Sequence, residues 1–301
     1  MARDLLWRGT LIVLAEQAEQ RAGQIFGIVQ GGNRAHGREI LRAHDHPSTP
    51  TVHHGVKNMY LAGSQIGFGK AIAVTLAREG CDVIVTALHM KGAEQTAATV
   101  RETGRKAIAV QADISNKDSA KALVKTGLDK FGHIDILVNN AGAMHVYKPF
   151  VEITEEEGEA ALNLNLRGAI IITKAVLPGM IERKWGKIIN ITSIGAKKGM
   201  HNTAFYGTSK AGLIGFTQVI ANELIRKGIN VNGVSPGYGR TNFGGKNLPV
   251  ELQKSDPSEM IPSGRGVTGQ DIANMVAFLA SDVASDIVGQ NISVDGGESI
   301  V

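Results

Sequence analysis

Three residues in the C-terminal half of the chain have the types and spacing needed to move a proton at a substrate oxygen. Ser193 follows an apolar β-branched run, Tyr206 comes thirteen residues later, and Lys210 lies four residues beyond Tyr206. A spacing of four places Tyr206 and Lys210 on one face of a helix, about one turn apart. A phenol with a pKa of about 10 is a poor base at neutral pH, but a neighbouring ammonium lowers that pKa. Tyr206 could then exchange a proton with a substrate oxygen that the Ser193 hydroxyl orients.

A glycine-rich turn earlier in the chain is typical of a nucleotide-binding site. Gly63, Gly67 and Gly69 follow a predicted strand and open a predicted helix. The first glycine permits a tight turn, the second lets a pyrophosphate approach the backbone, and the third permits close helix–sheet packing. About twenty residues on, where an NAD-binding unit places Asp or Glu, the chain has Ala87. Since no carboxylate there repels a 2′-phosphate, we expect NADP in preference to NAD.

Short β-branched runs alternate with helical patterns around these residues. The predicted strands are Asn58–Ala62, Asp82–Ala87, Ala107–Ala112, Ile134–Val138, Gly186–Thr192, Ile229–Val234 and Asn291–Val294. The predicted helices are Lys70–Glu79, Gly92–Gly104, Lys117–Phe131, Glu155–Arg183, Tyr206–Lys227 and Gly269–Ala280. This alternation predicts a single α/β domain over residues 55–301, a Rossmann-type doubly wound parallel β-sheet with helices on both faces.

Residues 1–54 do not follow this alternation. They hold five of the nine histidines, but the spacing matches no standard set of metal ligands. We expect an N-terminal extension that is poorly ordered and binds no metal.

Composition excludes several classes of protein. The net charge is +4 over 301 residues, aromatic residues make up 5%, and no dense basic run occurs, so nucleic-acid binding is disfavoured. The single cysteine, Cys81, rules out an internal disulfide framework and a cysteine-based zinc cluster. No apolar run approaches the ~18 residues that span a bilayer. We therefore expect a cytoplasmic protein with no membrane segment.

Taken in order, five features resemble those of the classical short-chain dehydrogenase/reductase family over residues from about 56 to 301. They are the glycine turn, Asn139-Asn140-Ala141-Gly142, Ser193, Tyr206 with Lys210, and Pro236-Gly237. The resemblance implies an NAD(P)-dependent oxidoreductase that interconverts a secondary alcohol and a ketone, or a primary alcohol and an aldehyde, by hydride transfer. It also implies a homotetramer or homodimer paired through the helices Glu155–Arg183 and Tyr206–Lys227.

The resemblance assigns roles to particular residues. Tyr206 becomes the general acid/base, Ser193 positions the substrate oxygen, Lys210 holds the nicotinamide ribose, and Asn165 anchors a water relay to the lysine. The expected cofactor-binding residues are Gly63, Gln65, Gly67, Phe68, Gly69, Ala87, Asp113, Ile114, Asn140, Ala141, Gly142, Tyr206, Lys210, Pro236, Gly237 and Thr241. The expected substrate pocket is lined by Ala143, Met144, His145, Ile194, His201 and Tyr238, with a lid near residues 239–262.

Each role has a simpler alternative. Asn165 could cap or kink its helix, Asp113 could close a strand-to-helix turn, and the spacing of Tyr206 and Lys210 also fits a buried tyrosine beside an unrelated surface lysine. The pocket positions suggest a small or medium hydroxyl compound. The family's acyl-carrier reductases usually have Thr-Arg-Asp where this chain has Met144-His145-Val146, which disfavours an acyl-carrier substrate.

Several residues depart from the family pattern. The turn opens with Ala62 where the family has Thr, so a hydroxyl that ties the turn to the Asn139–Gly142 loop is missing. Phe68 replaces the usual Ile, and Gly158 and Gly239 fall where helix formers or bulk are usual. These departures keep a second hypothesis open, a non-catalytic binding or regulatory relative with a degraded cofactor turn. An epimerase or dehydratase of the extended branch is disfavoured, because it would have a larger C-terminal domain.

Overall fold

The structure is a computed structural model that describes residues 58–62 by their backbone and residues 67–239 and 261–301 in full. The expected extension 1–54, the turn residues Gly63 and Gln65, Thr241 and most of the expected lid at 239–262 lie outside the described residues. The domain boundaries therefore stay a prediction.

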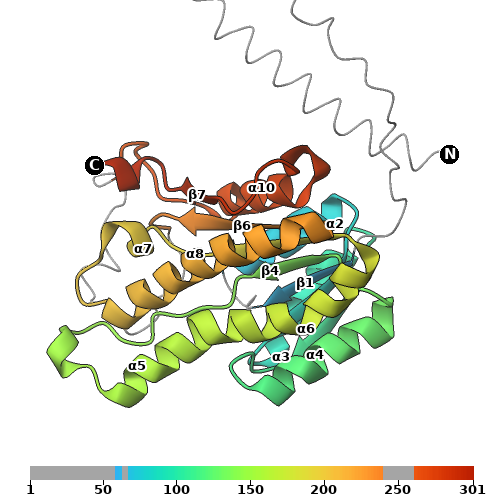
Figure 1. Cartoon of the computed structure of the whole chain (residues 1–301), viewed down its shortest axis with the longest axis horizontal. Helices are drawn as coiled ribbons and strands as arrows, with labels where there is room; N and C mark the ends of the chain where they lie inside the picture. Colours follow the sequence, from blue (N-terminus) through green and yellow to red (C-terminus); the bar gives the residue numbers. More distant parts are fainter. Residues whose placement is uncertain (1–57, 63–66, 240–260) are drawn as a thin grey trace, which may run out of the picture. The chain divides into compact units, whose positions relative to one another are not determined.

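Seven parallel strands form one sheet in the order β3-β2-β1-β4-β5-β6-β7 (Figure 1). They are β1 (Asn58–Ala62), β2 (Asp82–Ala87), β3 (Ala107–Gln111), β4 (Ile136–Asn139), β5 (Gly186–Ile191), β6 (Ile229–Pro236) and β7 (Asn291–Val294). The strand order reverses direction between β1 and β4, which is the switch point where doubly wound folds bind their ligands. The predicted fold class is confirmed.

Helices cover both faces of the sheet and divide the core in two. The helices are α2 (Phe68–Arg78), α3 (Met90–Arg101), α4 (Lys117–Phe131), α5 (Glu155–Leu162), α6 (Gly168–Arg183), α7 (Gly195–Lys198), α8 (Ala204–Leu224) and α10 (Gly269–Ala280). α2, α3 and α10 pack on one face against Val83, Val85 and Val138, while α4, α6 and α8 pack on the other against Ile84 and Leu137. Neighbouring strand residues point to opposite faces, so each buried strand supplies both halves of the core.

The predicted helix Glu155–Arg183 is present but is not uniform. A capping box between Thr154 and Glu157 begins α5, and a π-helical turn over Asn163–Arg167 separates α5 from α6. By length and composition alone the stretch Glu155–Arg183 could cross a bilayer, although the sequence predicts no membrane segment. Here it packs on α4 and α8 and buries the polar side chains of Asn165 and Thr173. Core helices pass the same test of length and composition.

Candidate active site

The predicted catalytic residues converge at the carboxyl ends of β4, β5 and β6. Ser193 follows β5 by two residues, and Pro236 is the last residue of β6. Tyr206 lies in the first turn of α8 and Lys210 one turn further along the same helix. The backbone N–H of Ile194 donates to Pro236 O at 3.1 Å, which ties the end of β5 directly to the end of β6.

Ser193 and Tyr206 share a hydrogen bond between their side chains. Both are nearly closed off from solvent, with 9% of Ser193 and 7% of Tyr206 exposed. The Ser193 oxygen also accepts from the backbone N–H of Gly195 at 3.0 Å, at the start of the short helix α7. The two hydroxyl groups are therefore held side by side in a largely dehydrated position, as joint action on one substrate oxygen requires.

Burial controls the protonation of Tyr206 and Lys210. It raises the pKa of Tyr206 to about 12, and the hydrogen bond from Ser193 only partly opposes this rise. It also lowers the pKa of Lys210 to about 8. The sequence predicts a lowered Tyr206 pKa, but the loss of water around the phenolate dominates and raises it. At neutral pH Tyr206 is a protonated phenol that can donate.

Lys210 and Asn165 enclose the loop after β4. The Lys210 Nζ donates to Ile191 O at 2.8 Å. Asn165 makes two bonds to the backbone of Ala143: its Oδ1 accepts from the N–H at 2.9 Å and its Nδ2 donates to the carbonyl at 3.0 Å. A Cβ atom on Gly142 would lie 2.8 Å from Asn165 Oδ1 and 3.0 Å from Lys210 Nζ. A side chain at this position would displace both groups, so Gly142, Asn165 and Lys210 lie close together as predicted.

The π-turn is what presents Asn165. It interrupts the regular helix at Asn163–Arg167, and the Asn165 side chain is 1% exposed within it. π-turns of this kind are frequent at functional sites, where they aim a side chain that a regular helix would direct elsewhere. The sequence offered a cap or a kink at Asn165 as an alternative to a functional role; the structure has a π-turn there, and this turn also positions the side chain.

The start of α2 can receive an anionic group. Gly67 precedes the helix with φ of 129°, a conformation that favours glycine, and the first turn contains no acidic residue. Phe68 is half-buried and Gly69 is buried against the sheet. Since the first N–H groups of a helix have no partner within it, the described part of this turn fits a phosphate.

The expected adenosine end lies at the carboxyl ends of β2 and β3. Ala87 ends β2 and is buried, while His89 and Lys91 beyond it are exposed. Asp113 Oδ1 accepts from both the N–H and the hydroxyl of Ser115, at 2.9 and 2.6 Å. Asp113 therefore closes the strand-to-helix turn, as the simpler alternative predicted. Its contact with adenine, and that of the buried Ile114, stay predictions.

Asn139 belongs to the Asn139–Gly142 motif, but the sequence assigned it no role of its own. Its Nδ2 donates to Asn190 Oδ1 at 2.8 Å and to Thr173 Oγ1 at 3.1 Å, and Asn190 in turn donates to Thr217 Oγ1. The buried Asn139 Oδ1 has no hydrogen-bond partner among the described residues. The network joins β4 and β5 to α6 and α8, the helices that adjoin Asn165 and carry Tyr206.

The expected pocket residues differ in their exposure to solvent. Met144 and Ile194 are buried, Tyr238 is half-buried, and His145 and His201 are exposed. Although the His145 side chain is exposed, the protein removes part of the water around its ring, and this desolvation lowers its pKa. Met200, which the sequence reasoning missed, places its sulfur 2.9 Å from where a Cβ on Gly195 would lie. Met200 therefore lies close to the serine, and the rest of the expected pocket stays a prediction.

Two glycines that depart from the family pattern have structural reasons. A Cβ on Gly239 would lie 2.6 Å from Val267 O, and one on Gly158 would lie 2.5 Å from the ring of Phe205. That ring also packs against Phe150, with 6.2 Å between ring centroids. Gly158 thus makes room for the residue that precedes Tyr206.

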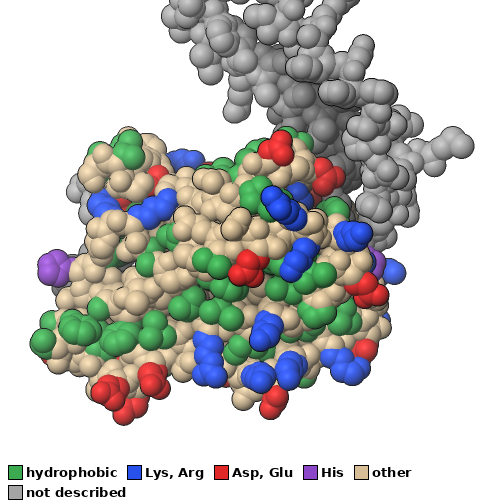
Figure 2. All heavy atoms as spheres, viewed as in Figure 1, with side chains coloured by type: hydrophobic (Ala, Val, Ile, Leu, Met, Phe, Trp, Pro, Cys, Tyr) green, Lys and Arg blue, Asp and Glu red, His purple; other side chains and the backbone are tan. Residues whose placement is uncertain are grey.

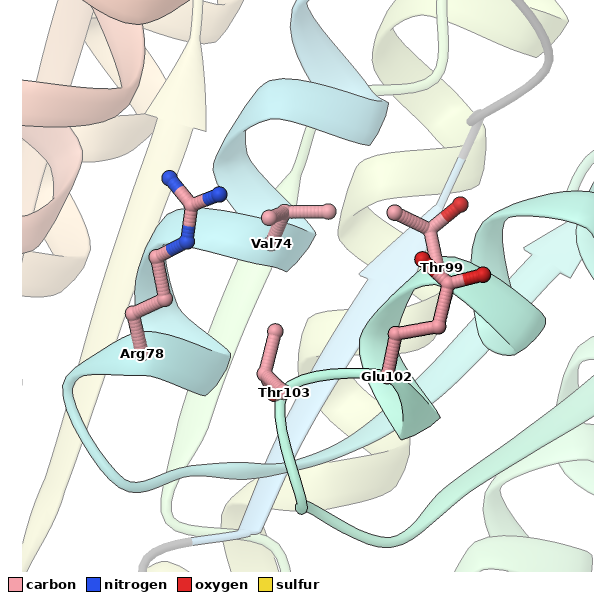
Figure 3. A pocket seen from close by; sticks show the side chains of 5 residues that line it. All are labelled: Val74, Arg78, Thr99, Glu102 and Thr103. Atoms are coloured by element: carbon pink, nitrogen blue, oxygen red, sulfur yellow. The ribbon is translucent and has the colours of Figure 1, made fainter.

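A surface groove elsewhere on the fold is unrelated to this site. It encloses about 390 Å³ between α2 and α3 and is lined by Val74, Arg78, Thr99, Glu102 and Thr103 (Figure 3). None of the four catalytic candidates contributes to it. Geometry and chemistry therefore locate the candidate active site at Ser193 and Tyr206.

Comparisons with known proteins agree with this geometry. A family model described as enoyl-(acyl carrier protein) reductase matches residues 62–299. A 3-oxoacyl-[acyl-carrier-protein] reductase of Synechocystis sp. is 39% identical over 239 residues, which cover 79% of this chain and 94% of the relative. A relative of the same name from Vibrio cholerae is 37% identical over 237 residues, or 79% of this chain and 95% of its own.

Two solved structures share the fold. Levodione reductase superposes with a TM-score of 0.78 and is 32% identical over 81% of this chain and 98% of its own. A variant of actinorhodin polyketide ketoreductase, solved with NADPH, superposes with a TM-score of 0.76 and is 33% identical over 82% and 98% of the two chains.

Proposed function

The chain belongs to the classical short-chain dehydrogenase/reductase family and is an NAD(P)-dependent oxidoreductase of carbonyl and alcohol groups, and we propose that it reduces a ketone to a secondary alcohol with NADPH, reversibly, through Tyr206. The convergence of Ser193, Tyr206, Lys210 and Asn165 at the ends of β4 and β5 carries this proposal. An aldehyde and its primary alcohol are the related pair.

The proposed mechanism divides the work between cofactor and chain. A bound nicotinamide supplies or accepts the hydride. Tyr206, protonated at neutral pH because burial raises its pKa to about 12, donates the proton to the substrate oxygen. Ser193 donates a hydrogen bond to the same oxygen and holds the carbonyl in place. Lys210, fixed on Ile191 O, supplies positive charge close to the Gly142 backbone.

The described residues fit a dinucleotide along the ends of the central strands. The start of α2 after Gly67 would hold the phosphates. The backbones of Gly142, packed against Lys210, and of Gly237, packed against Glu298, would adjoin the nicotinamide and its ribose. Asn140, Ala141 and Pro236 would adjoin them. NADP is supported by the buried Ala87 in the acidic residue's usual place and by the NADPH of the actinorhodin ketoreductase structure.

We propose a free carbonyl compound of small or medium size as the substrate. The apolar Ile194 adjoins Ser193, and the Met200 sulfur lies close to Gly195, so apolar side chains stand near the serine. A second candidate is a 3-oxoacyl thioester, favoured by the names of the relatives that are 37 and 39% identical. Measuring kcat/KM with simple ketones and with a 3-oxoacyl thioester would show which of the two substrate classes the chain prefers.

The test combines cofactor binding with one substitution. NADPH should quench or shift intrinsic fluorescence on titration, and Tyr206→Phe should keep that binding while turnover falls at least about a hundredfold. Tyr147→Phe, a half-buried tyrosine outside the group of four, is the matched control. A chain that binds neither NADPH nor NADH at millimolar concentration would instead be the non-catalytic relative.

We also propose a homotetramer or homodimer in the cytoplasm. Figure 2 shows hydrophobic side chains spread over the face that carries α5, α6 and α8. Ile181 on α6 and Val219 on α8 are exposed. Acidic side chains gather at the start of α5. Exposed apolar side chains on long helices suit pairing between identical faces. Light scattering checks this, and a clean monomer would contradict it.

A further inference from the structure

Glu298 bonds to both segments that flank the candidate catalytic serine. It begins the short 3-10 turn Glu298–Ile300, beyond β7. Its carboxylate Oε2 accepts from the backbone N–H of Tyr238 at 2.7 Å, and its main-chain oxygen accepts from Lys198 Nζ at 2.9 Å. Tyr238 follows β6, and Lys198 ends the helix α7 that begins after Ser193. One residue thus joins the two loops, at the end of the sheet where α7 and the C-terminus lie (Figure 1).

The segment that carries Glu298 is itself fixed. The Asp295 carboxylate accepts from the N–H groups of Gly297 and Ser299, at 3.0 and 3.1 Å. Gly237 donates its N–H to Val294 O at 3.0 Å, which attaches the start of the Tyr238 loop to the end of β7. The Glu298 side chain therefore extends from a rigid base, and its carboxylate sets where the Tyr238 amide lies.

The packing leaves little room for these groups to move independently. A Cβ on Gly237 would lie 2.6 Å from Asp295 Cα and 3.0 Å from Glu298 Oε2. Pro236, one residue earlier, accepts from the N–H of Ile194, the neighbour of Ser193. A displacement of the Tyr238 amide would therefore be transmitted through Gly237 and Pro236 to the backbone next to the serine.

The fold alone does not require a carboxylate at this position. Tyr238 O is already bonded to the N–H of Val267 at 2.9 Å, and Tyr238 is only half-buried, so water could satisfy its N–H. An ionised acceptor makes a shorter and stronger bond to an N–H group than water does. What the carboxylate adds is a defined position for the loop.

We propose that Glu298 is a positioning residue for the reaction, which sets the Gly237–Tyr238 backbone against Ser193 and the nicotinamide. The KM for the ketone can be measured only if the proposed function holds, whereas the Kd for NADPH requires cofactor binding alone. Glu298→Ala should raise the Kd for NADPH about tenfold and raise the KM for the ketone more than it lowers kcat. Glu298→Gln keeps an oxygen acceptor in the same place and should stay within about twofold of the native chain in both constants.

Two further variants complete the experiment. Lys198→Met removes the second bond to Glu298 and should raise the same two constants by a smaller factor of about three. Glu159→Ala, an exposed residue on α5, is the matched control and should change neither constant. The Kd is measured by NADPH fluorescence and the unfolding midpoint by thermal denaturation.

The outcomes separate a positioning role from a structural one. A lower unfolding midpoint for Glu298→Ala with unchanged Kd and KM overturns the proposal, and so does a Glu298→Gln chain as impaired as Glu298→Ala. If Glu298→Ala does not fold, native-like constants for Glu298→Gln together with raised constants for Lys198→Met support the proposal, and any other pair overturns it. A native chain that binds NADPH but reduces no carbonyl contradicts the proposed function, while the Kd comparison still decides the role of Glu298.

Discussion

Replacing Lys210 by Met should stabilise the folded chain at neutral pH while removing its activity. The Lys210 ammonium is 2% exposed, and its pKa falls from 10.5 to about 8 on folding because burial disfavours the charge. The unfolded chain therefore binds more protons between pH 8 and 10.5, and the stability of the native chain rises with pH across that window. Methionine has a similar length and carries no charge, so this pH dependence should disappear in the variant.

The size of the effect follows from the same two pKa values. The buried charge costs about 3 kcal/mol at pH 7 and about 1 kcal/mol at pH 10. Against this, the variant loses the bond from Nζ to Ile191 O, worth about 1–2 kcal/mol. Lys210→Met should thus be more stable than the native chain by about 1–2 kcal/mol at pH 7 and slightly less stable at pH 10.

Urea denaturation of both chains at pH 7 and pH 10 measures this difference. The exposed Lys174 on α6 provides the control, since Lys174→Met should change the free energy of unfolding equally at both pH values. Turnover by Lys210→Met should fall at least about a hundredfold. A variant less stable than the native chain at pH 7, or a difference independent of pH, would refute the argument that burial of this charge destabilises the fold.

Two further substitutions test the packing around the site. Gly142→Ala should lower turnover at least about a hundredfold with little change in the unfolding midpoint, because the new Cβ would displace Asn165 Oδ1 and Lys210 Nζ. Steady-state kinetics and thermal denaturation measure the two quantities. Native-like turnover would contradict the role given to these contacts. Gly158→Leu should cost about 1–3 kcal/mol by overpacking against the Phe205 ring, and urea denaturation showing an unchanged midpoint would contradict this contact.

Most element boundaries were predictable because their signals are local. The helices Lys117–Phe131 and Gly269–Ala280 have the predicted bounds, since the side chains of Asn116 and Thr268 cap their first turns. β6 continues two residues past its predicted end because Ser235 and Pro236 pair with β7, a partner nearly sixty residues away. That pairing carries no local signal.

Which residues come together in the candidate site could be predicted from the sequence, but the pKa of Tyr206 could not. Tyr206 and Lys210 follow from spacing, but the pKa of Tyr206 depends on how completely the fold removes water, which spacing does not reveal. The Asn139–Asn190 pair joins residues 51 positions apart. The π-turn could not be predicted either, because Asn163–Arg167 contains neither proline nor glycine to mark an irregular helix.

The π-turn accommodates one extra residue within the helical stretch Glu155–Arg183. A π-turn holds one residue more than a regular turn, so the positions before and after Asn163–Arg167 are out of phase by about 100°. Deleting one residue within the turn would restore an unbroken α-helix and would rotate all of α5 relative to α6. Gly158 would then no longer face Phe205, and Asn165 would no longer face Ala143. In this stretch the length of the chain matters as much as the identity of its residues.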